Sequence, residues 1–129
     1  AVVIPQACPL FVPLVEEGWI DAPVTRLVAQ EYLRPYEGTN IDALVLGCTH
    51  YPLLKPVITG VLGSGVTLVD SAVETAREVA RVLATRGIAA PSGEGEFHIV
   101  LSDTSPSFGD IATRFLGRRV ADIELVSVL

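Results

Sequence analysis

The sequence lacks the features that direct a chain to a membrane or out of the cell. No apolar run approaches the roughly 18 residues that a membrane-spanning helix needs. The chain does not open with a charged segment, an apolar stretch and a small-residue cleavage site. We therefore expect a cytoplasmic protein that makes no contact with membranes.

Basic residues are also scarce. The chain has 9 lysines and arginines against 15 aspartates and glutamates, which gives a formal net charge of −6. Arg118 and Arg119 form the only adjacent basic pair, so the sequence contains no cationic stripe that could neutralise phosphates. This composition argues against nucleic acid as the primary ligand.

Cysteine is limited to Cys8 and Cys48. These two residues could in principle form a disulfide, but so few cysteines are more typical of a chain in a reducing compartment. With 129 residues, half of them hydrophobic, the chain is long enough to bury a core without disulfides or metal ions.

Short β-branched runs alternate with helical segments along the chain. Strands are predicted at residues 1–4, 41–47, 66–69, 97–101 and 123–129, and helices from Pro23 to Pro35, from Pro52 to the glycines at 60–65, at 72–85 and at 107–116. This alternation predicts βαβ units with parallel strands, and hence an α/β fold. The loop 91–96 contains two glycines and a proline, which leaves open whether the strands form one sheet or two.

Four residues are predicted to mark helix ends. Asp21 is expected to be an N-cap, with Pro23 close to the first helical position. Asp70 is expected to cap the helix 72–85, and Gly87 to end it as the residue after its C-terminus.

The stretch Leu44 to Leu54 reads LVLGCTHYPLL and places Cys48 between a predicted strand and a helix started by Pro52. In α/β sheets, ligands bind at the edge formed by the carboxyl ends of the strands, because strand ends and helix N-termini meet there. Cysteine acts as a base only as the thiolate, and the partial positive charge of a helix N-terminus favours an anion. His50 could donate to the sulfur or relay a proton, and Thr49 could bind an anion. These residues indicate a thiol base beside a carboxylate-binding site.

Other interpretations of the same residues stay open. A cysteine on a strand is often a small buried hydrophobic residue, and Thr49 in isolation could be a plain N-cap. A metal site could combine Cys48, His50 and Cys8, but tetrahedral sites normally use three or four ligands and no second cluster is present. We therefore expect no metal.

Two acidic residues and a second histidine are further candidates. Glu16 and Glu17 end a strongly apolar segment, which places at least one of them near the core, although such pairs are most often solvated. His98 lies on a predicted strand and is interpreted as structural.

The residues around Cys48 also resemble a known family. Residues 47–54, GCTHYPLL, resemble the second catalytic cysteine motif of glutamate racemases, in the aspartate/glutamate racemase superfamily. Residues 7–18, ACPLFVPLVEEG, resemble the segment that precedes this motif in the same family, and residues 69–72 also fit. The resemblance implies a two-lobed α/β fold and the interconversion of L- and D-glutamate without a cofactor, which supplies D-glutamate for peptidoglycan.

The resemblance implies roles for individual residues. In this family two cysteines face opposite sides of the substrate's α-carbon, and each serves in turn as base and acid. Cys48 matches the second cysteine, which acts on L-glutamate. Thr49 and His50 match a pair that contacts substrate, and His50 also assists Cys48. Glu16 matches an auxiliary proton-transfer group, with Glu17 as the alternative.

The sequence departs from the family pattern in one respect. Whole racemases are roughly twice as long and open with an Asp-Ser-Gly loop, a Tyr-Gly pair and a first cysteine followed by Asn-Thr, none of which is present here. We therefore expect the C-terminal half of a racemase, in which residues 1–69 belong to the second lobe and residues 70–129 return to complete the first.

Several consequences follow for activity and partners. The chain alone is expected to be inactive, and its partners are expected to be the substrate glutamate and either a second copy or a missing N-terminal half. Two other functions stay open: racemisation of another small carboxylate such as aspartate, and a non-catalytic interaction fragment.

Overall fold

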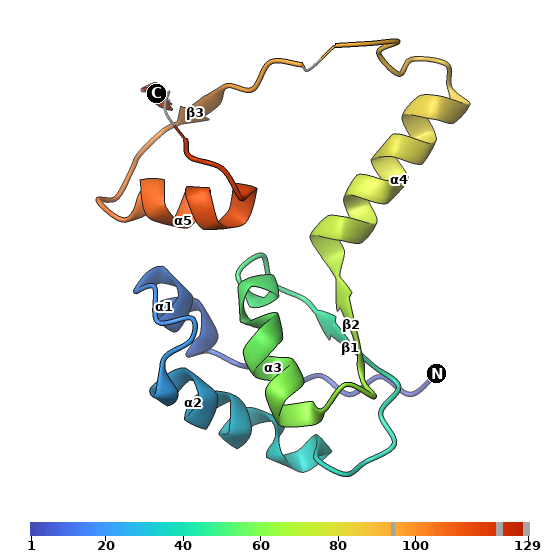
Figure 1. The fold of residues 1–129 in the computed structure, drawn as a ribbon, viewed down its shortest axis with the longest axis vertical. Helices are drawn as coiled ribbons and strands as arrows, with labels where there is room; N and C mark the ends of the chain where they lie inside the picture. Colours follow the sequence, from blue (N-terminus) through green and yellow to red (C-terminus); the bar gives the residue numbers. More distant parts are fainter. Residues whose placement is uncertain (94, 121–122, 128–129) are drawn as a thin grey trace. The chain divides into compact units, whose positions relative to one another are not determined.

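The computed structural model describes residues 1–93, 95–120 and 123–127. It forms two compact units, residues 1–79 and 80–129. In chain order (Figure 1) the elements are α1 (Phe11–Glu16), α2 (Pro23–Leu33), the 3-10 helix η1 (Arg34–Tyr36), β1 (Ala43–Leu46), the 3-10 helix η2 (Tyr51–Leu54), α3 (Lys55–Leu62), β2 (Thr67–Asp70), α4 (Ser71–Thr85), β3 (Ile99–Leu101), α5 (Phe108–Leu116) and β4 (Ile123–Leu125). The predicted α/β class is confirmed.

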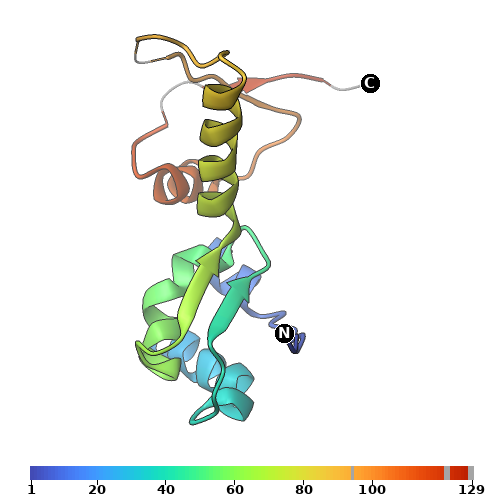
Figure 2. The ribbon, with the colours of Figure 1, turned by 90° about the vertical axis from the view of Figure 1, so that its right-hand side faces the viewer.

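Both strand pairs are parallel, as the alternation of strands and helices predicted. β1 pairs with β2 in a register that runs from Ala43 opposite Thr67 to Leu46 opposite Asp70. Figure 2 shows these two strands side by side, with α4 continuing directly from the end of β2. β3 pairs with β4. In the described part of the chain the strands therefore form two separate two-stranded sheets.

The core of the first unit lies among α1, α2, α3, η2 and β1. The ring of Phe11 packs edge-on against Tyr32 and Tyr51, with 5.4 Å between ring centroids in each pair. This geometry is favourable for aromatic rings because a positive edge meets a negative face. The largest fully buried side chains are Phe11, Val15, Thr25, Leu33, Leu46, Leu54 and Ile58.

The start of α2 differs from the prediction. Pro23 occupies its first turn as expected, but the N-cap is Ala22, which makes no side-chain cap hydrogen bond. Asp21 lies one residue too early to serve as the N-cap, whose side chain would accept a hydrogen bond from the first turn. The prediction of an Asp21 cap is therefore wrong.

The segment after Cys48 also differs. Instead of one helix from Pro52, the chain forms η2 and then α3, which begins at Lys55. Pro56 has no N–H to bond to the carbonyl of Pro52, and the N–H of Lys55 takes that carbonyl in a 3-10 bond. Because the helix dipole acts mainly within the first turn, α3 lends Cys48 less positive potential than the sequence suggested.

The strand predicted at residues 1–4 is absent. These residues are irregular, and Val2 and Val3 are 90% and 86% exposed. A strand needs a neighbour to satisfy its backbone groups, and none of the described strands pairs with this segment. At the other end, the predicted run 123–129 yields β4, while residues 128–129 lie outside the described residues.

The predicted ends of α4 are confirmed. Oδ1 of Asp70 accepts hydrogen bonds from the N–H groups of Ala72 (2.9 Å) and Val73 (3.3 Å). At the other end Gly87 has φ of 66°, and its N–H bonds to the carbonyl of Ala84. The N–H of Ile88 reaches the carbonyl of Leu83, which completes a Schellman motif.

Replacing a fully buried side chain tests the core of the first unit. Ile58 is 1% exposed, and Ile58→Val is expected to lower the free energy of unfolding by about 0.5–1.5 kcal/mol through the lost methylene and the cavity it leaves. Ile4→Val removes the same group at a side chain that is 60% exposed and is expected to have almost no effect. Urea unfolding followed by the fluorescence of the single tryptophan, Trp19, measures both; equal losses in the two variants would contradict the assigned core.

Candidate active site

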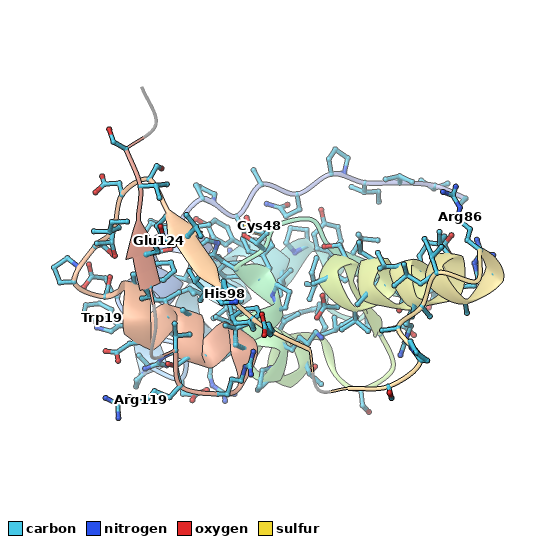
Figure 3. All side chains as sticks on the ribbon, turned by 90° about the horizontal axis from the view of Figure 1, so that it is seen from above. Trp19, Cys48, Arg86, His98, Arg119 and Glu124 are labelled. Atoms are coloured by element: carbon cyan, nitrogen blue, oxygen red, sulfur yellow. The ribbon has the colours of Figure 1, made fainter. Side chains whose placement is uncertain are left out.

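Cys48 lies two residues beyond the end of β1, in the loop that leads into η2 (Figure 3). Its thiol is free and half-buried. It thus occupies the carboxyl edge of the β1–β2 pair, the edge at which α/β sheets bind ligands. The structure places this cysteine where the sequence predicted it.

His50 is held at both ring nitrogens. Its Nε2 bonds to Oε1 of Glu16, and its Nδ1 lies 3.1 Å from Oγ1 of Thr49. Because a carboxylate only accepts hydrogen bonds, Nε2 is the donor to Glu16. In the neutral ring Nδ1 then accepts from the Thr49 hydroxyl. The ring is oriented, and its side chain keeps 21% of its surface exposed.

A second contact joins the same two segments. The hydroxyl of Tyr51 donates to the carbonyl of Cys8 at 3.1 Å, while its ring packs against Phe11 of α1. The segment that carries His50 and Tyr51 is therefore attached to α1 and the residues before it at two points. This attachment brings Glu16, the last residue of α1, to the imidazole.

The two adjacent acids are separated by this geometry. Glu16 contacts His50, whereas Glu17 is the C-cap residue of α1, exposed, with its N–H bonded to the carbonyl of Pro13. Of the two carboxylates, Glu16 is the one that the structure brings to the predicted site.

Cys8 has a different environment from Cys48. It is 6% exposed within the core cluster, and burial raises the pKa of its thiol. Burial is also the main cause that raises the pKa of the nearby Tyr51 hydroxyl. Cys8 is thus a buried thiol that resists ionisation.

Asp70 makes a contact that the sequence did not suggest. Its Oδ2 lies 2.5 Å from Nζ of Lys55, the first residue of α3, and its side chain is only 10% exposed. The bond from Lys55 is the largest of the causes that lower the pKa of Asp70, and the N–H groups of Val73 and Ala72 add to it. Lys55 and Asp70 are 15 positions apart, a separation with no helical or strand period that could have revealed the pair.

Other candidate sites receive no support in the described part of the chain. There, no group of three or more histidine, cysteine, aspartate or glutamate residues could hold a metal ion. His98, labelled in Figure 3, has a side chain that is 78% exposed and lies 3.5 Å from Glu96. None of the described helices is both long and apolar enough to cross a bilayer.

Comparison with known proteins finds glutamate racemases among both the similar sequences and the similar structures. A glutamate racemase of Chlorobaculum tepidum is 47% identical over 127 residues, which are 98% of this chain and 47% of the relative. A glutamate racemase of Thermus thermophilus, solved with β-chloro-D-alanine, superposes with a TM-score of 0.83 at 48% identity, over 95% of this chain and 47% of the other. The enzyme of Francisella tularensis with D-glutamate gives a TM-score of 0.84 at 32% identity. No family model matches the chain.

The fold of the chain matches part of the α/β fold of the aspartate/glutamate racemase type. Within that type, the chain is similar over nearly all its length to glutamate racemases, and the predicted resemblance is confirmed. The chain spans about half the length of the relatives that it matches.

The low pKa of Asp70 predicts a specific dependence of stability on pH. Because the pKa in the folded chain lies below the ordinary value of about 3.9, the carboxylate contributes stability in full above that pH and loses it as the pH falls through the folded pKa. Asp70→Asn should therefore flatten the acid limb of a plot of unfolding free energy against pH. Asp21→Asn, at an exposed site, is the control, and an acid limb unchanged in Asp70→Asn would contradict the assignment.

Proposed function

We propose that this chain is the part of a glutamate racemase that carries one of its two catalytic cysteines. The reaction is the cofactor-independent interconversion of L- and D-glutamate, which supplies D-glutamate for peptidoglycan in the cytoplasm. One observation carries the proposal: Cys48 follows a strand at the ligand-binding edge, beside an imidazole held by Glu16 and Thr49, in a chain 47% identical to a glutamate racemase.

The chemistry follows from these groups. The Cys48 thiolate takes the α-proton of L-glutamate, so the C–H bond breaks, an S–H bond forms and the electron pair passes into the α-carboxylate. His50, held by Glu16, supports proton transfer at the sulfur, and Thr49 and His50 contact the substrate. Donors at the α-carboxylate stabilise the charge that develops there.

Inversion also needs an acid on the opposite face of the α-carbon. Cys8 does not suit this role because it is buried in the core and its thiol pKa is raised. In this proposal the second thiol comes from the portion of a racemase that this chain does not match. Residues 1–69 then belong to the lobe with Cys48, and residues 70–129 complete the other lobe.

An interaction fragment without catalysis is the second candidate. It is favoured by α4, none of whose residues is buried although Val73, Val79 and Leu83 recur along the helix. Such a helix normally buries its apolar face, which gives the chain a surface for a partner.

A chimera distinguishes the two candidates. The chain would replace the matched part of the Thermus thermophilus racemase and be incubated with L-glutamate in deuterated water. We expect α-deuteration and formation of D-glutamate by the chimera and none by the isolated chain, because one face then lacks its acid. Cys48→Ser in the chimera should reduce turnover by roughly 100- to 10,000-fold, the usual contribution of a general acid or base.

The matched control in that chimera is Cys8→Ala, which removes the buried thiol outside the proposed machinery. It should leave kcat and KM near those of the parent. A racemising isolated chain, or a Cys48→Ser chimera as fast as its parent, would refute the proposed role of Cys48.

The two acids provide a second test in the chimera. Glu16→Gln keeps a polar side chain but removes the charge that holds His50, and kcat should fall roughly 10- to 100-fold, as expected for a lost hydrogen bond to a charged group. Glu17→Gln makes the same change one residue along and should keep the parental rate. Equal losses of kcat in the two variants would contradict a role of the Glu16–His50 contact in catalysis.

A further inference from the structure

The loop that carries Cys48 is attached to one residue at both of its ends. At the N-terminal end, Leu46 is the strand residue paired with Asp70 in the parallel register. At the C-terminal end, Nζ of Lys55 lies 2.5 Å from Oδ2 of Asp70. Between Leu46 and Lys55 lie residues 47–54, which include Cys48 and His50.

The carboxylate of Asp70 divides its two oxygens between two tasks. Oδ1 accepts from the N–H groups of Ala72 and Val73 and so starts α4, while Oδ2 faces Lys55. The side chains of Asp70 and Lys55 are 10% and 36% exposed, whereas those of the surface pair Arg34 and Glu31 are 67% and 65% exposed. A charge-assisted bond at a buried carboxylate is stronger and more rigid than an exposed pair.

The contact also has a distinct mechanical effect. The side chains of Leu54 and Ile58 already bury η2 and α3 in the core. Packing of that kind is not directional. A hydrogen-bonded ion pair is directional, and it fixes the position of Lys55, the first residue of α3, relative to the end of β2. The ion pair therefore fixes the distance between the two ends of the loop 47–54, which carries Cys48 at the carboxyl edge of the sheet.

We propose that Lys55 and Asp70 are positioning residues, which close the Cys48 loop at the sheet edge and hold the thiol and His50 in place. We call the Lys55–Asp70 ion pair the clasp. Its effect on catalysis rests on the proposed racemase function. The clasp itself does not, because it concerns the order of the loop in this chain.

Alkylation of the two cysteines tests the clasp. Mass spectrometry would follow iodoacetamide labelling of the full chain at mildly alkaline pH, with Cys48 as the reporter of the loop and buried Cys8 as the reporter of the core. Lys55→Gln should raise the labelling rate of half-buried Cys48 roughly tenfold, because the loop opens more often, while Cys8 stays slow. Asp70→Asn, which keeps an oxygen for the α4 cap, should do the same.

Three further variants make the test specific. Lys55→Arg keeps the charge and should keep the parental rate. The double variant with Lys55→Gln and Asp70→Asn should label no faster than either single variant, because both remove one interaction. Arg34→Gln removes an equal charge from the exposed pair in the same unit and should change neither rate.

An unchanged or lower Cys48 rate in Lys55→Gln would overturn the clasp. A parallel rise at Cys8 would also overturn it, because it would show general unfolding. In the chimera, Lys55→Gln should lower kcat more than it changes KM. If the parent chimera does not racemise glutamate but the labelling pattern holds, the proposed function fails and the clasp stands.

Discussion

The parallel pairing of β1 with β2 is the constraint on which the candidate site depends. Parallel strands bring their carboxyl ends to one edge, so the chain leaves the sheet twice at the same place. One exit carries Cys48 and His50, and the other places Asp70 opposite Leu46. Without this register Asp70 would not reach Lys55, and the loop would lose one of its two attachments.

The imidazole of His50 depends on a second set of contacts, those between α1 and η2. The ring of Phe11 fills the space beside Tyr51, and the Tyr51 hydroxyl satisfies the carbonyl of Cys8. These contacts are buried or half-buried, whereas the Glu16 carboxylate that they deliver keeps 43% of its side-chain surface exposed. Apolar packing thus places Glu16 next to His50, and the exposed end of α1 supplies the carboxylate that bonds to the imidazole.

Burial separates the two cysteines of the chain into different chemical classes. Cys8 is enclosed by the core, where the charged form of a thiol is disfavoured and the residue behaves as a small apolar side chain. Cys48 is half-buried at the sheet edge, where its thiol stays partly accessible. The two thiols therefore differ in accessibility, and Cys48 is the one that belongs to the candidate site.

The sequence by itself determined the elements whose causes are local. The proline at the start of α2, the Asp70 cap and the Gly87 end of α4 follow from short-range hydrogen bonds and allowed φ angles, and the motif around Cys48 predicted the similarity to glutamate racemases. Local rules failed where two signals competed, as when Ala22 rather than Asp21 capped α2 and when Pro56 delayed α3 to Lys55.

Only the tertiary structure decided which distant residues meet. It separated Glu16 from Glu17, buried Cys8, and joined Lys55 to Asp70. The physical reason is that these contacts join residues 15 to 43 positions apart, and they arise from strand register and side-chain packing rather than from any periodic pattern along the chain.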